Sequence, residues 1–178
     1  SATVTAVHLS GTGWTSVDAR DRLPELQALF ERCRGFFEQE FGRPPRPDEA
    51  AQALADGPPG KGPADKHFLL LLRNGAAVGH VEVLRDFRRA REAYLGNFVL
   101  APELRGQGLG REVLAALEAA LAAQGFESLR LAATDQNARG RRFWEAVGFR
   151  VDKVFPPRRL GERETVLYEY VKALAGGA

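Results

Sequence analysis

The sequence predicts an α/β fold in which a mixed central β-sheet carries helices on both faces. Three observations support this prediction: apolar residues at helical spacing near the N-terminus, a hairpin signal between two apolar runs, and alternating strand and helix patterns in the second half. The chain has 178 residues, of which 44% are hydrophobic and 27% are charged. This is the size of one ordinary domain, so we expect residues 1–178 to form a single domain.

The first expected element is an amphipathic helix over residues 22–41, where leucines, phenylalanines and Cys33 recur at helical spacing. Residues 42–66 follow and hold most of the ten prolines of the chain. Because proline fixes φ and lacks an amide donor, we expect a proline-rich loop here, with at most a short helix over residues 48–55.

A group of strands follows the proline-rich loop. Residues 67–72 and 77–84 are apolar runs separated by Asn74-Gly75, which is a strong signal for a hairpin turn. Residues 85–93 form a charged loop that includes four arginines, and residues 94–100 read as another strand that ends before Pro102.

Helices and strands alternate in the second half. The pattern predicts a helix over residues 108–124 that Gly125 ends, and a strand over residues 128–133. A second helix is expected from the N-cap Asn137 to about residue 147, with Gly148 as its stop. Two further strands are expected over residues 150–154 and 164–170.

Glycines stand at every second position between an expected strand and an expected helix, at residues 106, 108 and 110. Since glycine lacks a Cβ atom, the backbone amides there can approach a ligand closely. The helix N-terminus adds free N–H groups and a positive dipole end, and Arg105 and Arg111 add fixed charge. The segment therefore predicts an anion site suited to a pyrophosphate, with a solvated glycine turn as the alternative. A dinucleotide-binding Gly-x-Gly-x-x-Gly pattern would need glycine at 111, and a P-loop would need Gly-Lys-Ser/Thr, so neither fits.

Two blocks of the sequence resemble the motifs of the GCN5-related N-acetyltransferase (GNAT) superfamily. Residues 105–110, Arg-Gly-Gln-Gly-Leu-Gly, resemble its (Gln/Arg)-x-x-Gly-x-(Gly/Ala) motif. Residues 137–149, Asn-Ala-Arg-Gly-Arg-Arg-Phe-Trp-Glu-Ala-Val-Gly-Phe, resemble its Asn-x-x-Ala-x-x-(Phe/Leu)-Tyr-x-x-x-Gly-Phe pattern, with Gly140 in place of alanine and Trp144 in place of tyrosine. The Phe-Trp pair resembles a bacterial subset of the superfamily.

The resemblance implies a GNAT fold in which a splayed pair of parallel strands holds acetyl-CoA. The pyrophosphate would lie on the amides of residues 105–110, and the pantetheine arm would pair like an extra strand with residues 98–100. Asn137 would contact this arm, and Phe143 and Trp144 its thiol end. The implied cofactor-binding residues are Phe98, Val99, Leu100, Arg105, Gly106, Gln107, Gly108, Leu109, Gly110, Arg111, Asn137, Gly140, Phe143 and Trp144.

The resemblance also implies the chemistry, which is direct transfer of an acetyl group from a thioester to an amine. An alkylamine with a pKa near ~10.4 is neutral to only roughly 1 part in 2,500 at pH 7, so a base must accept its proton. Glu82 is the favoured candidate, Tyr94 a second, and Glu92 and Asp86 are further options. Each of these side chains could instead be an ordinary surface or packing group. We expect His80 to be structural.

Trp144 stands where the family usually has a tyrosine, which is taken to protonate the departing thiolate. An indole N–H donates hydrogen bonds but does not transfer its proton at neutral pH. The thiolate would therefore leave unprotonated, take a proton from water or find another acid. Simple packing of Trp144 against the sheet is the alternative.

Composition excludes several other classes of function. The three histidines and Cys33 are scattered without ligand spacing, so we expect no metal. A net charge of +2 is a poor footprint for nucleic acid, and no apolar run approaches the ~18 residues of a membrane span. Because one cysteine cannot form an internal disulfide, a reducing, cytoplasmic location is expected. By analogy with the superfamily, a homodimer is possible.

The sequence thus predicts an acetyl-CoA-dependent N-acetyltransferase that acts on a small-molecule or peptide amine of unknown identity. Two alternatives remain open. One is a non-catalytic acyl-CoA-binding regulatory module on the same fold, which the tryptophan at position 144 favours. The other is an adaptor whose cleft binds no cofactor.

Overall fold

The structure is a computed structural model that describes residues 6–175, so residues 1–5 and 176–178 of the predicted domain lie outside the described residues. Its centre is an eight-stranded sheet with the strand order β1-β2-β3-β4-β5-β6-β10-β7. In that order, the strands span Ser10–Gly11, Trp14–Asp18, Lys66–Arg73, Ala76–Leu84, Glu92–Leu100, Ser128–Thr134, Leu167–Ala173 and Arg150–Val154. All neighbours are antiparallel except β5 and β6. A separate hairpin joins β8 (Arg158–Leu160) to β9 (Arg163–Thr165).

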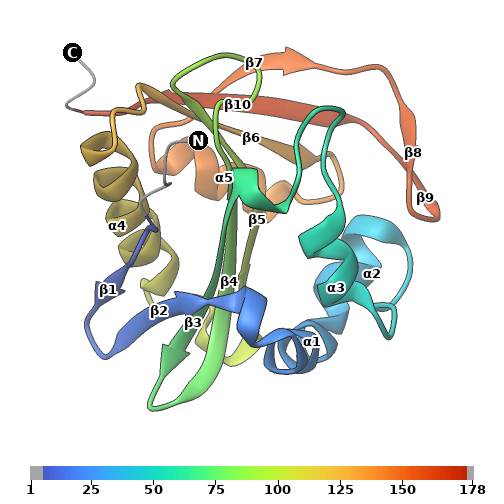
Figure 1. Ribbon diagram of the computed structural model, residues 1–178. Coiled ribbons are helices and arrows are strands. Elements are labelled where there is room, and N and C mark those ends of the chain that lie inside the picture. The colour runs from blue at the N-terminus through green and yellow to red at the C-terminus, as the bar shows by residue number, and fades with distance from the viewer. Residues whose placement is uncertain (1–5, 176–178) are drawn as a thin grey trace.

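Helices cover both faces of this sheet, as predicted (Figure 1). One face carries α4 (Leu109–Ala123) and α5 (Ala138–Ala146), and the other carries α1 (Leu23–Arg32), α2 (Arg34–Phe41) and α3 (Glu49–Ala55). Strand β3 shows the consequence, because Leu69 and Leu71 pack on the α4 side while Phe68 and Leu70 pack on the α1 side. A strand buried on both faces reads as a continuous apolar run, which is the pattern seen at residues 68–72.

Several elements lie where the sequence places them. The Asn74-Gly75 turn has positive φ at both residues (52° and 77°), as a two-residue hairpin turn requires. The short helix α3 follows Asp48, and α4 ends just before Gly125, whose φ is +92°. The expected strand after the charged loop is also present, although it starts two residues earlier, at Glu92.

The single N-terminal helix expected over residues 22–41 is instead two helices that meet at Cys33. The Cys33 amide donates to the carbonyls of both Leu29 and Phe30, and Cys33 itself lies outside helical geometry (φ −94°, ψ 28°). In a straight helix, residues seven apart are separated by roughly 10 Å along the axis. The break brings Phe30 and Phe37 into edge-to-face contact with ring centroids 5.2 Å apart, so aromatic packing accounts for it.

Two further features differ from the expectation. The sequence did not indicate β1 and β2, because an inward position of β2 is the polar Ser16, whose hydroxyl accepts from the Leu9 amide at 2.7 Å. The single strand expected over residues 164–170 is divided between β9 and β10. Asp135 causes the division, since its carboxylate accepts from the Thr165 hydroxyl (2.8 Å) and from the Val166 amide (3.0 Å) where the chain crosses between them.

The parallel pair β5–β6 separates part of the way along its length, as the fold class predicts. Residues 92–95 pair with residues 128–131, and no pairing between the two strands follows the Leu95–Leu131 pair. Beyond that point β5 continues to Leu100 against β4, and β6 continues to Thr134 against β10. The separation leaves one backbone edge of each strand without a strand partner in the middle of the sheet.

Candidate active site

The edge of β5 that faces the separated β6 offers free backbone groups. The Ala101 amide donates to the Val78 carbonyl of β4 at 2.8 Å. Because ladder bonds alternate along an antiparallel pair, the N–H and C=O groups of Phe98 and Leu100 point the other way, toward the separation. The side chain of Val99 lies in the core instead. An extended ligand could therefore pair with this edge through main-chain hydrogen bonds.

The glycine-rich segment begins where β5 ends, and its backbone needs glycine at two positions. Gly106 and Gly108 have φ of +75° and +82°, a region that side-chain-bearing residues rarely adopt, and Gly108 is the N-cap of α4. At Gly110 a Cβ atom would lie 3.5 Å from side-chain atoms of both Leu100 and Phe143, which is ordinary van der Waals contact, so the structure does not require glycine there. The segment thus presents its backbone directly to solvent.

Positive charge and unpaired amides converge on the N-terminus of α4. The first helical bond is donated by Glu112 to the Gly108 carbonyl (3.2 Å), so the amides of residues 109–111 have no intrahelical partner. Arg105, Gln107 and Arg111 are exposed polar residues next to these amides in the sequence, whereas the side chain of Leu109 is buried in the core. This arrangement suits a phosphate-bearing anion.

Asn137 lies across the separation, at the start of α5. Its Oδ1 accepts from the Gly140 amide at 2.8 Å, which confirms the expected N-cap. Phe143 and Trp144 follow on the same helix. The Trp144 ring lies at the centre of an aromatic cluster, with centroid distances of 5.5 Å to Phe98, 5.0 Å to Phe143 and 5.5 Å to Phe149.

The face of the sheet opposite α4 is uncovered at the point of separation. Gly96 on β5 and Ala132 on β6 are exposed although both strands are central in the sheet. Gly96 is the extra residue of a β-bulge, because Glu82 pairs with Asn97 while the adjacent Val83 pairs with Leu95.

The Glu82 carboxylate lies over this uncovered part of the sheet around Gly96 and Ala132, which we call the floor. A Cβ atom at Gly96 would be only 2.5 Å from Glu82 Oε2, so the glycine leaves room for the carboxylate. Burial raises the pKa of Glu82, and the Lys66 ammonium, 3.2 Å from Oε1, opposes the rise. Lys66 is itself held by the carbonyls of Ala53 and Leu54 at the end of α3 (2.7 and 3.3 Å).

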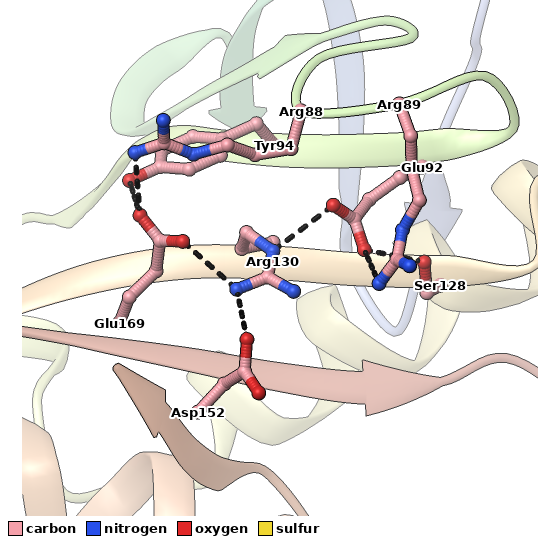
Figure 2. A network of polar contacts seen from close by, with 8 residues as sticks. All are labelled: Arg88, Arg89, Glu92, Tyr94, Ser128, Arg130, Asp152 and Glu169. Atoms are coloured by element: carbon pink, nitrogen blue, oxygen red, sulfur yellow. Dashed lines mark hydrogen bonds and ion pairs between the residues drawn. The ribbon is translucent and has the colours of Figure 1, made fainter.

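Tyr94, the second candidate, belongs to a network of polar contacts beside this floor (Figure 2). Its hydroxyl donates to Glu169 Oε2 at 3.4 Å, and burial, followed by the Glu169 charge, raises the pKa of Tyr94 to about 12. Arg88 reaches the same Glu169 oxygen at 2.9 Å from the charged loop.

Arg130 is the centre of the network in Figure 2. It donates to Glu92 (2.9 Å), Asp152 (2.8 Å) and Glu169 (2.8 Å), and Glu92 also accepts from Ser128. Glu92, one of the further candidate bases, is thus fully buried and engaged by a cation. Since the three carboxylates are balanced by Arg88, Arg89 and Arg130, the network is a set of paired charges.

The remaining candidates have structural contacts. Asp86 accepts from the Arg91 amide at 2.8 Å within the charged loop. His80 is fully buried between Phe30 and Phe68, its Nδ1 lies 2.7 Å from the Leu69 carbonyl, and burial lowers its pKa to about 4. Burial raises the pKa of the Cys33 thiol, which disfavours a thiolate there, and this thiol contacts the Leu100 carbonyl.

Glu40 also contacts this site, although no pattern in the sequence predicted it. From α2, its carboxylate reaches the end of β6 and the start of α5, where it accepts from the Thr134 hydroxyl and from Asn137 Nδ2 (3.0 Å). A glutamate on an amphipathic helix ordinarily faces solvent. The available signal was its position between Phe37 and Phe41, at the border of the apolar face.

Among the described residues, no group of three or more histidine, cysteine, aspartate or glutamate side chains is arranged to hold a metal ion. Over the same residues 6–175, no helix has the length and apolar character needed to cross a membrane.

Comparison with known proteins places this geometry in context. Residues 23–149 match the model of the acetyltransferase (GNAT) family. Among solved structures, an acetyltransferase from Thermus thermophilus is 23% identical and superposes with a TM-score of 0.74, covering 94% of this chain and 100% of its own. The ribosomal-protein-S18-alanine N-acetyltransferase from Escherichia coli is 20% identical, with a TM-score of 0.65 over 90% of this chain and 92% of its own. A ribosomal L7/L12 α-N-protein acetyltransferase in complex with coenzyme A is 14% identical, with a TM-score of 0.74 over 96% of this chain and 99% of its own. At these identities the structural likeness establishes the fold.

Proposed function

Because the chain belongs to the acetyltransferase (GNAT) family, we propose that it transfers an acetyl group from acetyl-CoA to a primary amine of a small molecule or peptide. Family membership agrees with the enzyme class that the sequence predicts, an N-acetyltransferase. The single observation that carries the proposal is the separation of β5 from β6 after Leu95, directly ahead of the glycine-rich segment and α4.

The chain's own groups fit acetyl-CoA on both sides of this separation. The amides of residues 109–111, which have no intrahelical partner, suit a pyrophosphate, and the backbone edge at Phe98 and Leu100, which has no strand partner, suits the amide-bearing pantetheine arm. Asn137 faces the same gap from the start of α5. When bound, acetyl-CoA would supply an acetyl group already activated as a thioester.

We assign the proton-accepting role to Glu82. A protonated amine acceptor must lose a proton before it can attack, and the Glu82 carboxylate lies at the uncovered floor where β5 and β6 separate. Burial raises the pKa of Glu82 toward neutrality, which makes its carboxylate a stronger base. Tyr94 is less suited to exchange protons at neutral pH, because its pKa is raised to about 12.

The backbone edge at Phe98 would be positioned to donate to the developing oxyanion. Two of the structural relatives are described as acetyltransferases of ribosomal proteins, so peptide amines belong in the substrate screen beside small-molecule amines.

One observation favours a regulatory, non-catalytic alternative. Trp144 occupies the place of the usual tyrosine and is engaged in an aromatic cluster with Phe98, Phe143 and Phe149. A chain without an acid for the departing thiolate could bind acyl-CoA without turning it over. A thiol pKa near ~8.5 lies only about 1.5 units above neutrality, so the thiolate can leave without a protein acid, and we favour the enzyme.

The experiment is release of free thiol from acetyl-CoA over a panel of amines, for the wild-type chain and for Glu82→Gln. Glutamine can still accept from Lys66, so the variant removes the base and retains the contact. We expect kcat to fall about 10² to 10⁴-fold, the range for loss of a general base. Glu25→Gln, an exposed residue on α1, is the matched control and should be unchanged.

The outcomes separate the two functions. Acetyl-CoA binding without thiol release for any amine would support the regulatory module. A Glu82→Gln variant with full activity would remove Glu82 from the mechanism and leave the enzyme proposal standing.

A further inference from the structure

Both polar ends of the Asn137 side chain are engaged. Oδ1 accepts from the Gly140 amide at 2.8 Å, and Nδ2 donates to Glu40 Oε1 at 3.0 Å. Since a carboxylate only accepts hydrogen bonds, Glu40 fixes which end of the carboxamide is Nδ2. A carboxamide has two N–H donors, so one N–H of Nδ2 is left for a further acceptor.

Glu40 is held as firmly as the residue it contacts. It is 7% exposed, and its second oxygen accepts from the hydroxyl of Thr134, the last residue of β6. Burial raises its pKa, and hydrogen bonds from Thr134 and Asn137 oppose the rise. A buried carboxylate with a partner on each oxygen has little freedom to reorient.

The last turn of α2, which carries Glu40, forms hydrogen bonds with two neighbouring segments. Gln39 donates to the Gln136 carbonyl at 2.9 Å in the turn that precedes α5. On the other side, Arg163 of the β8–β9 hairpin donates to the Glu38 carbonyl at 3.1 Å, and the Glu162 amide donates to the Phe41 carbonyl at 2.8 Å. Helix α2 lies on the face of the sheet opposite α4, and these contacts connect it to α5, which lies on the α4 side.

Gly140 is a second, independent feature that acts on Asn137. A Cβ atom at Gly140 would lie 2.4 Å from Asn137 Nδ2, 2.7 Å from Cγ and 2.8 Å from Oδ1. Any other residue at 140 would thus force the carboxamide out of its present position. The motif that this segment resembles has alanine here, so this chain departs from the motif at the position next to the Asn137 carboxamide.

We propose that Glu40 is a positioning residue that, together with the space left by Gly140, orients the Asn137 carboxamide so that its remaining N–H meets a carbonyl of the pantetheine arm. The inference rests on the proposed function, because it takes the arm to lie between β5 and β6. Helix α2, which carries Glu40, would thereby affect the affinity for acetyl-CoA through Asn137.

The test is the Kd of acetyl-CoA, measured by titration calorimetry for four single variants, two of which are also made in the Asn137→Ser background. Asn137→Ser retains an N-cap oxygen and removes the carboxamide, and we expect affinity to fall about tenfold, as for loss of one hydrogen bond to the cofactor. Glu40→Ala should cause a similar loss. Glu40→Gln should stay within about twofold of wild type, because glutamine can accept from Asn137 and donate to Thr134.

Gly140→Ala is the most discriminating variant. Alanine improves helix propensity relative to glycine, and displacement of the Asn137 N-cap costs a similar amount of helix stability, so the melting temperature should change little. Because the added Cβ displaces Asn137, acetyl-CoA affinity should nevertheless fall about tenfold, and this loss should vanish when Gly140→Ala is made in the Asn137→Ser background.

Each contrary result has a distinct meaning. If wild type does not bind acetyl-CoA, the proposed function fails. If wild type binds but Asn137→Ser does not weaken binding, only the inference is overturned. It is equally overturned if Gly140→Ala and Glu40→Ala bind normally, if their losses persist in full in the Asn137→Ser background, or if Glu40→Gln loses as much affinity as Glu40→Ala. Gly140→Ala and Glu40→Gln keep the test decisive should Glu40→Ala not fold.

Discussion

Replacing Gly96 by alanine tests the placement of Glu82 with one methyl group. The new Cβ would lie 2.5 Å from Glu82 Oε2, about 0.9 Å inside the 3.4 Å at which ordinary contact begins. The φ of Gly96 is outside the left-handed region, so alanine fits the backbone and the carboxylate must move. A displacement of about 1 Å can cost a catalytic group roughly 10²-fold in rate.

We therefore expect Gly96→Ala to lower kcat/KM for amine acetylation by about 100-fold while the Kd of acetyl-CoA stays within about twofold. The assay is thiol release at fixed acetyl-CoA with the best amine, paired with calorimetric binding. Gly35→Ala is the matched control, because no atom lies within 4 Å of its Cβ position and it should leave the rate unchanged.

The double variant Gly96→Ala/Glu82→Gln shows whether the methyl group acts through Glu82. If it does, the double variant has the rate of Glu82→Gln alone. A Gly96→Ala variant with the wild-type rate would show that the reactive carboxylate does not lie over the bulge.

Two further predictions concern stability. Burial lowers the pKa of His67 and of His80 to about 4, below the 6.5 of the unfolded chain, so the unfolded state binds more protons and stability is lost as pH falls from 6.5 to 4. Chemical denaturation should show that the free energy of unfolding falls by about 2 kcal/mol per histidine between pH 8 and pH 5. The free energy of unfolding of His80→Phe should fall by about half as much as that of wild type over this interval, and equal losses would contradict the explanation. Arg130→Ala should cost about 3–5 kcal/mol, because it leaves the buried carboxylates of its network without their shared cation. The exposed Arg139→Ala should change stability by less than about 0.5 kcal/mol, and a similar effect of the two variants would show that the network contributes little.

Local signals allowed much of the fold to be predicted. Asn74-Gly75 needs two positive φ angles that few other residues adopt, and Gly106 and Gly108 supply the positive φ that the backbone before α4 requires. Asn137 caps α5 through its own side chain. Each of these features depends on residues within a few positions of one another.

Features set by contacts distant in sequence were not predictable in this way. The break at Cys33 follows from aromatic packing in the folded chain, and the polar interior of β2 hides its strand pattern. In the same way, Arg130 alternates with leucines like a solvent-facing residue, yet it is buried by carboxylates from β5 and β10. Glu40 meets Asn137 across 97 positions, which no local pattern reveals.

Binding of acetyl-CoA between β5 and β6 is the premise of the proposed function, and the melting temperature of the wild-type chain with and without acetyl-CoA tests it without any variant. At about 100 times Kd, linkage gives roughly 2.7 kcal/mol of stabilisation. For a chain of this size, that corresponds to a rise of roughly 5 to 11 °C. We expect a rise in this range, and an unchanged melting temperature at millimolar acetyl-CoA would show that the separation between the two strands is not a cofactor site.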